Sequence, residues 1–231
     1  MIDREHYDYQ RFSGARTLLA GVDLRAGVEP TGIAARKALV EPMVRALWDL
    51  WERGGRALHE IAAELYAAAD LMESGQDAPL KGITGTPEVL REIAEYVATW
   101  NVGSSARVAQ AIPTSAELAF RLPTLLEMLV IYYGQDGLAL EDDSLSPREG
   151  LRLAVDNYHP LCLWWLPHMA AECQEALAVF QTEEALERFF EVEHAVGTPG
   201  LPWLEWLPLI IDVFGEHMRA EHPPRWVRTS R

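Results

Sequence analysis

The chain has little of what would place it in several common protein classes. Among 231 residues there are only two cysteines and two lysines, and the longest apolar runs fall short of a membrane span. A membrane-spanning helix needs roughly 18 to 20 consecutive apolar residues. The first twelve residues are polar and charged, without the apolar core of a signal peptide. We therefore predict a cytoplasmic protein that makes no use of a membrane.

The two cysteines, Cys162 and Cys173, are too few for a disulfide framework or a cysteine-based zinc site. Eleven residues apart on a helix, they lie about three turns from each other, which is too far for a disulfide bond. We therefore expect two small buried residues in a reducing compartment.

The common catalytic motifs are also missing. The sequence contains no serine nucleophile elbow, phosphate-binding loop, dinucleotide-binding fingerprint or His-Glu-x-x-His motif. Asp142 and Asp143 lack the continuation of a calcium-binding loop. These absences favour a protein that is not an enzyme and that carries no cofactor.

Negative charge is what the chain has in excess, with a net charge of −15 at pH 7. A phosphate backbone repels such a surface, and so does an anionic membrane. We therefore expect no nucleic-acid partner. Strong acidity steers a protein toward a basic protein partner, although it also serves solubility alone.

Apolar residues recur with helical spacing, and no segment alternates as a strand does. This pattern predicts an all-α fold, an irregular bundle of about eight or nine helices in a single domain over residues 1–231. We expect a loosely attached helix in residues 1–27 and a basic, flexible tail in residues 220–231. The other expected helices cover residues 31–69, 87–100, 105–112, 115–133, 147–159, 160–180, 183–196 and 203–219. In the first of these, Pro42 is expected to interrupt or restart the helix, which then either runs through the Gly54–Gly55 pair or kinks there.

Helix starts are marked clearly by capping residues. Thr86 precedes a proline at the first helical position, and Thr182 precedes two glutamates. Thr114 and Ser146 each begin a capping box, in which a glutamate three residues later bonds back to the cap. Pro123 is expected to kink or break the helix in which it lies.

The most apolar window, Asn157–Cys173, contains both cysteines, two prolines, two histidines and a pair of tryptophans. We interpret it as a central packed helix that Pro160 begins and Pro167 bends. The functional candidates within this window are His159, near its start, and whichever of Trp164 and Trp165 is not packed in the core.

A metal centre is the alternative function. Asp156 and His159 lie three residues apart, as do Glu191 and His194, so each pair could bind one metal ion from one face of a helix. Two such pairs with further carboxylates, for which Glu127 is a candidate, form di-iron or manganese sites in helical bundles. This alternative is a helical metalloenzyme or an enzyme that binds a small molecule.

The leading hypothesis is a non-enzymatic protein that binds a basic partner. Residues 136–193 hold 13 acidic and three basic residues, and we expect this segment to form the docking face. The most concrete form is a bacterial immunity- or antitoxin-like protein that neutralises a basic toxin by covering its site. The expected contact residues are Asp136, Glu141, Asp142, Asp143, Glu183, Glu184, Glu187, Glu191, Trp164 and Trp165.

Overall fold

The computed structural model describes residues 9–20, 22, 24, 30, 32–52, 54–76, 80–101, 111–140 and 145–224. Within these residues the chain is built from ten α-helices and one π-helix, without strands, so the predicted all-α class is confirmed. The helix count exceeds the expected eight or nine. The chain divides into two compact units, Met1–Arg121 and Leu122–Arg231, and the assignment of a single domain stays a prediction.

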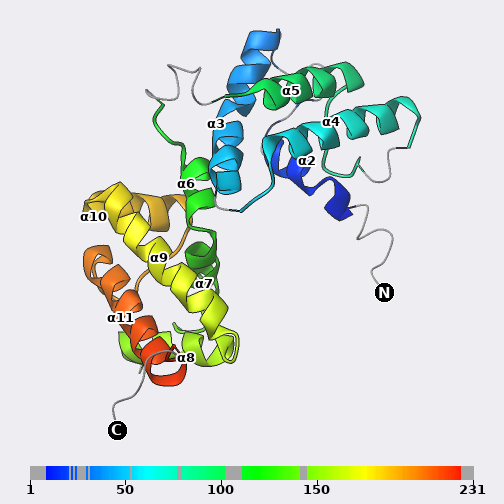
Figure 1. Cartoon of the computed structure of the whole chain (residues 1–231). Coiled ribbons are helices and arrows are strands. Elements are labelled where there is room, and N and C mark those ends of the chain that lie inside the picture. The colour runs from blue at the N-terminus through cyan, green and yellow to red at the C-terminus, as the bar shows by residue number, and fades with distance from the viewer. Residues whose placement is uncertain are drawn as a thin grey trace. The chain divides into compact units, whose positions relative to one another are not determined.

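Unit 1, Met1–Arg121, packs its long helices around one apolar core (Figure 1). Helices α4 and α5 lie along each other, and α3 packs on α6. Ile61, Leu65, Leu90 and Ile93 at the α4–α5 contact are all at most 1% exposed. The described helices of this unit are α2 (Ser13–Leu18), α3 (Ile33–Glu52), α4 (Leu58–Glu73), α5 (Pro87–Thr99) and α6 (Ser115–Arg121).

The N-terminal segment is better integrated than the sequence suggested. Phe12, Ala15 and Leu18 are fully buried in the core of unit 1. In addition, the Glu64 carboxylate on α4 accepts a hydrogen bond of 2.9 Å from the Ala15 backbone N–H. Over this stretch the segment is therefore part of the core rather than loosely attached. Residues 1–8 lie outside the described residues.

Two expected interruptions turned out differently. Helix α3 runs through Pro42 without a break, because Val40 and Val44 on either side of it are both fully buried in the same core. By contrast, α3 ends at Glu52, before the glycine pair. Gly54 has a φ of +94°, a conformation that glycine adopts readily and other residues rarely do, so the chain turns there into α4.

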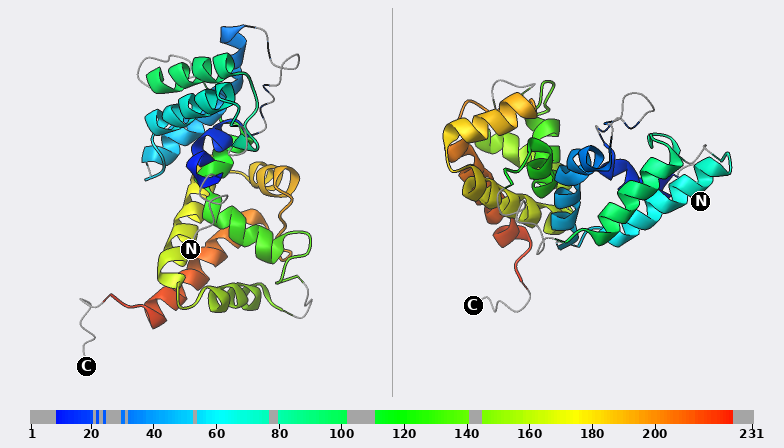
Figure 2. Two further views of the ribbon diagram at one scale, coloured as in Figure 1. Left: turned by 90° about the vertical axis from the view of Figure 1, so that its right-hand side faces the viewer. Right: turned by 90° about the horizontal axis from the view of Figure 1, so that it is seen from above.

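Unit 2, Leu122–Arg231, is organised around α9 (Figures 1 and 2). Helix α9 contacts α7, α8, α10 and α11, most extensively α11, which confirms its expected place as the central packed helix. It begins at Cys162 rather than at Pro160. The described helices are α7 (Pro123–Tyr133), α8 (Pro147–Tyr158), α9 (Cys162–Phe180), α10 (Glu183–Glu187), the π-helix η4 (Arg188–Glu193) and α11 (Trp203–Glu221).

The predicted caps are present. Thr86 and Thr182 accept hydrogen bonds from the backbone N–H groups of Val89 and Ala185, at 3.4 and 3.3 Å. The capping boxes at Thr114 and Ser146 form with their glutamates. The helix expected over residues 115–133 is broken, because α6 ends at Arg121 and α7 begins at Pro123. The peptide bond between His159 and Pro160 is cis. The helix expected over residues 105–112 falls largely outside the described residues, and so does most of the tail.

Candidate functional site

Helix α9 buries one face completely and exposes the opposite one. Its buried positions follow helical spacing and are all 0% exposed; they are Cys162, Leu166, Met169, Cys173 and Ala176. The exposed apolar side chains at the start of the helix are Leu161, the residue just before α9, at 56%, Leu163 at 46%, Trp164 at 63% and Trp165 at 39%. We call Leu161, Trp164 and Trp165 the exposed stripe.

The exposed stripe borders an aromatic cluster on the neighbouring helices. The Trp165 ring lies 6.2 Å from the ring of Tyr158 on α8, which lies 6.5 Å from the ring of Tyr132 on α7. The Asn157 side-chain amide donates a 2.9 Å hydrogen bond to the Tyr132 hydroxyl. The pKa of Tyr158 is raised to about 12, mainly because the side chain is buried. The nearby Tyr132 and the negative charge of Glu127 add smaller contributions.

The acidic residues expected to contact a partner fall into three groups. Asp136, Glu184 and Glu187 are exposed. Glu183 instead caps α11, because its two carboxylate oxygens accept the backbone N–H groups of Trp203 and Leu204 at 2.5 and 2.9 Å. Glu191 accepts the indole N–H of Trp203 at 2.8 Å. The remaining three, Glu141, Asp142 and Asp143, lie outside the described residues.

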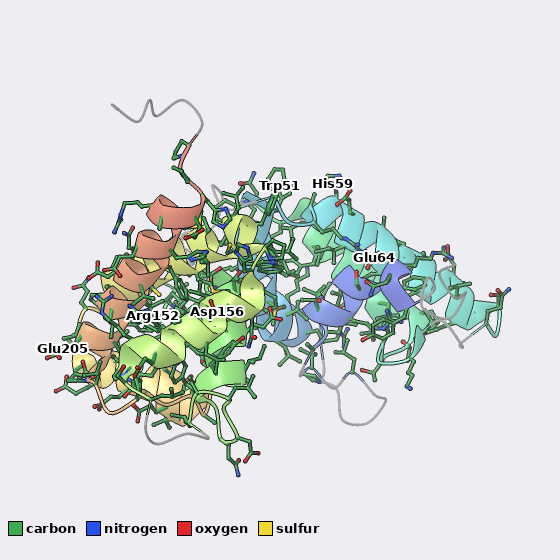
Figure 3. The ribbon with its side chains drawn as sticks, turned by 90° about the horizontal axis from the view of Figure 1, so that it is seen from below. Trp51, His59, Glu64, Arg152, Asp156 and Glu205 are labelled. Carbon is green, nitrogen blue, oxygen red and sulfur yellow. The ribbon has the colours of Figure 1, made fainter. Side chains whose placement is uncertain are left out.

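The two pairs of the alternative metal site do not come together around one point. Asp156 lies on α8, one turn from Arg152 (Figure 3). Glu191 is bonded to Trp203, and the His194 ring packs 4.6 Å from the Phe189 ring. Burial lowers the pKa of His194. Among the described residues, the one group of potential ligands that converges includes His159 but none of its three expected companions.

The converging group consists of His159, Cys162, His217 and His222. Their ligand atoms all lie within 4.8 Å of one another. The Cys162 Sγ is 3.6 Å from His159 Nδ1, 3.3 Å from His217 Nε2 and 2.7 Å from His222 Nε2. We call these four residues the Cys-His cluster. Cys162 is buried as expected, but its sulfur faces three imidazole rings rather than an apolar core.

The electrostatics of the Cys-His cluster favour neutral imidazole at His217. Burial lowers the pKa of His217, and the neighbouring His222 and His159 rings lower it further. The negative charges of Glu221 and Asp156 raise this pKa in part. Neutral imidazole has a free nitrogen lone pair and is the form that binds metal ions. By their geometry, the four residues bring one sulfur and three ring nitrogens to the same point.

The sequence contained a signal for this cluster that the search for Glu-x-x-His pairs overlooked. His159 and Cys162 form a His-x2-Cys pair, and His217 and His222 form a His-x4-His pair. Each has the short ligand spacing seen in zinc sites, but 54 residues separate the two pairs. Only the packing of α11 against α9 shows that they meet.

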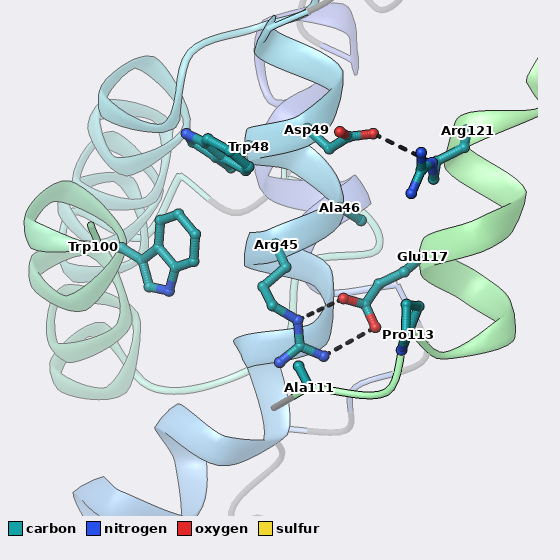
Figure 4. A pocket seen from close by; sticks show the side chains of 9 residues that line it. All are labelled: Arg45, Ala46, Trp48, Asp49, Trp100, Ala111, Pro113, Glu117 and Arg121. Atoms are coloured by element: carbon teal, nitrogen blue, oxygen red, sulfur yellow. Dashed lines mark hydrogen bonds and ion pairs between the residues drawn. The ribbon is translucent and has the colours of Figure 1, made fainter. Parts of the chain in front are cut away.

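Unit 1 has a cavity of its own, of about 160 Å³, between α3 and the segment leading into α6 (Figure 4). The Trp48 and Trp100 rings line it, with centroids 5.9 Å apart. The Arg45 guanidinium is paired with both oxygens of the Glu117 carboxylate, at 2.6 and 3.0 Å. Because its strongest charges neutralise each other, this cavity offers less distinctive chemistry than the Cys-His cluster.

None of the described helices is both long and apolar enough to cross a membrane. Comparison with known proteins adds no assignment: no family model, no curated protein and no solved structure matches the chain.

Proposed function

We propose that this chain binds a basic protein partner through unit 2, with the exposed stripe as its apolar anchor. The observation that carries the proposal is Trp164, which is 63% exposed although it lies on a helix whose other face is fully buried. A few large aromatic side chains at the centre of an interface supply most of the binding energy. Leu161, just before α9, and Trp165, next to Trp164 in the chain, add exposed apolar surface at the start of this helix.

The charge of unit 2 supports the choice of a basic partner. Residues 122–231 contain 18 acidic and seven basic residues, a net charge of −11 within the chain's −15. Glu127 and Asp156 are both exposed, and they lie on the helices that carry the aromatic cluster beside Trp165. Complementary charge accelerates the encounter of two proteins, while buried aromatic anchors hold the complex.

The most concrete form of this function is a bacterial immunity- or antitoxin-like protein that neutralises a basic toxin by covering its site. Asp136, Glu184 and Glu187 are exposed and could contribute to the contact. We do not include Glu183 and Glu191 as primary contacts, because their carboxylates already bond to the first residues of α11. Cytoplasmic location belongs to the same proposal.

The test uses the product of the gene adjacent to this chain's gene as the probe, titrated calorimetrically at low and high salt. We expect binding that weakens as salt screens the acidic surface. Trp164→Ala should weaken it by about 2 kcal/mol, roughly 30-fold in affinity, as for an interface hot spot. The matched control is Trp51→Ala, which removes a tryptophan that is 45% exposed in unit 1.

Two results would contradict the proposal. If the neighbouring product does not bind, the antitoxin form is wrong. If it binds, but Trp164→Ala and Trp51→Ala have the same effect, the exposed stripe is not the anchor.

A further inference from the structure

We propose that His159, Cys162, His217 and His222 bind a single metal ion of the zinc class, which joins the start of α9 to the C-terminal end of α11. The inference does not depend on the proposed partner, because it concerns only side chains inside unit 2.

Two of the three sulfur–nitrogen distances fit a tetrahedral ion. Zinc binds a thiolate at about 2.3 Å and an imidazole nitrogen at about 2.0–2.1 Å, so a sulfur and a nitrogen on one tetrahedral zinc lie about 3.5 Å apart. Two of the three observed separations from Cys162 Sγ, 3.3 Å to His217 and 3.6 Å to His159, lie close to this value. The 2.7 Å separation to His222 is shorter, and binding would move this ring outward by about 0.8 Å.

Hydrogen bonding accounts for the arrangement only weakly. A thiol has one weak hydrogen to donate and its sulfur is a weak acceptor, so one ring nitrogen can accept and the other rings would have to donate their N–H groups to a poor acceptor. Yet nitrogens of His159, His217 and His222 all lie within 3.6 Å of the same sulfur. A cation at the centre resolves this, because a thiolate and three nitrogen lone pairs then all point toward positive charge.

The backbone explains why the two histidines of α11 can reach the same point. Side chains five residues apart on a continuous helix point about 140° away from each other. However, α11 ends at Glu221, and His222 follows with φ −127° and ψ 45°, outside the helical region. This change of direction brings the His222 ring back to the side of His217. At the other end of the site, His159 directly follows the last residue of α8, and Cys162 begins α9.

The ligand set identifies the class of metal and its role. One thiolate with three imidazoles suits zinc, whereas the oxygen-rich sites preferred by magnesium, calcium and manganese need carboxylates. Four protein ligands fill a tetrahedral shell and leave no position for a substrate, which is typical of a structural rather than a catalytic zinc site. The ion would then stabilise the α9–α11 contact of unit 2.

The first experiment measures metal stoichiometry on the full-length protein, stripped with a chelator and reloaded with Zn²⁺. We expect one zinc ion per chain. At free zinc about 100-fold above the dissociation constant, the thermal midpoint should rise by roughly 5–10 °C. Loading with Co²⁺ instead should give the intense visible bands of a tetrahedral site together with a thiolate-to-cobalt charge-transfer band.

Variants locate the site. His222→Ala should weaken zinc binding by more than about 100-fold, since even the loss of a group that only bonds to a ligand costs about 10- to 100-fold. His222 follows the last residue of α11, so this change leaves the helix interior intact. Cys162→Ala should abolish the charge-transfer band. The matched controls are Cys173→Ala, another fully buried thiol of α9, and His168→Ala, an exposed histidine of the same helix. Circular dichroism checks that each variant is folded.

Three outcomes would overturn the proposal. In the first, the folded wild-type protein takes up neither Zn²⁺ nor Co²⁺ in stoichiometric amount. Co²⁺ could bind without a thiolate band, which would exclude Cys162 as a ligand. Finally, equal zinc binding by the wild-type protein, His222→Ala and Cys162→Ala would show adventitious binding elsewhere.

Discussion

Cys162 Sγ and His222 Nε2 lie 2.7 Å apart although 60 residues separate them in the chain. The contact joins the first residue of α9 to the residue that directly follows α11. The same sulfur also faces His159 and His217, which makes it the centre of the Cys-His cluster. Unit 2 thus has its most distinctive chemistry at one end of its main helix pair.

The reactivity of the two thiols should depend differently on zinc. After chelation, we expect Cys162 to react with a thiol reagent at least about tenfold faster than in the zinc-loaded protein, because the end of α11 is then held less firmly. Cys173 is fully buried in the middle of α9, and burial raises its pKa, so it should react slowly in both states. Mass spectrometry of the alkylated protein measures each site, and zinc-independent labelling of Cys162 would count against a metal.

Glu183→Ala should destabilise unit 2. Its carboxylate accepts the N–H groups of Trp203 and Leu204 at the start of α11, where it also interacts favourably with the helix dipole. We expect a loss of about 1–2 kcal/mol in the free energy of unfolding, as for removal of a helix cap. Urea denaturation measures this. Glu184→Ala is the control, because this neighbour is exposed and should change stability by less than about 0.5 kcal/mol. Equal effects at both positions would refute the capping role.

Tyr133→Phe should leave stability unchanged or raise it by up to about 1 kcal/mol. The Tyr133 hydroxyl is buried and has no hydrogen-bond partner among the described residues, and removing an unsatisfied polar group relieves its desolvation cost. Tyr132→Phe is the matched control: it removes a hydroxyl that accepts a 2.9 Å hydrogen bond from Asn157, at a cost of about 1 kcal/mol. If urea denaturation shows that Tyr133→Phe is the more damaging change, the hydroxyl has a partner such as a buried water molecule.

Glu172 should make the stability of unit 2 dependent on pH. Burial raises the pKa of Glu172 above its usual 4.5, although the carboxylate accepts a 2.6 Å hydrogen bond from the Leu125 backbone N–H. A carboxyl group whose pKa is higher in the folded state stabilises the fold fully below the unfolded-state pKa, and this contribution is lost as pH rises through the folded-state pKa.

Glu172→Gln tests this relationship, because glutamine stays neutral at every pH. Relative to the wild-type protein, the variant should gain stability as pH rises from about 4 to 7. Denaturation midpoints of the two proteins, compared across this range, measure the difference. A constant difference would mean that the pKa of Glu172 is the same in the folded and unfolded states.

The sequence by itself determined the all-α class and several of the helix ends. Caps such as Thr86 with Val89, and the box that Ser146 forms with Glu149, involve residues three apart, so their geometry is local and can be recognised without a fold. The alternation of buried and exposed positions along α9 is likewise local. It already implied that Cys162 and Cys173 lie inside.

Where local sequence preferences and tertiary packing favoured different outcomes, only the tertiary structure showed which one the chain adopts. Pro42 would end an isolated helix, but burial of the residues on both sides keeps α3 continuous. Glu183 and Glu191 looked like parts of an acidic surface, yet their carboxylates bond to Trp203 on another helix. The sequence shows that these residues are charged, but it does not show which backbone or side-chain group each carboxylate binds.

The Cys-His cluster shows the same division most clearly. The pairs His159 with Cys162 and His217 with His222 are visible in the sequence, and each alone is unremarkable because such pairs are common. Their meeting depends on how α11 lies along α9 and on the rotation of each helix about its axis. Helical periodicity determines which residues share a face, whereas contact between faces is determined by the packing of the whole unit.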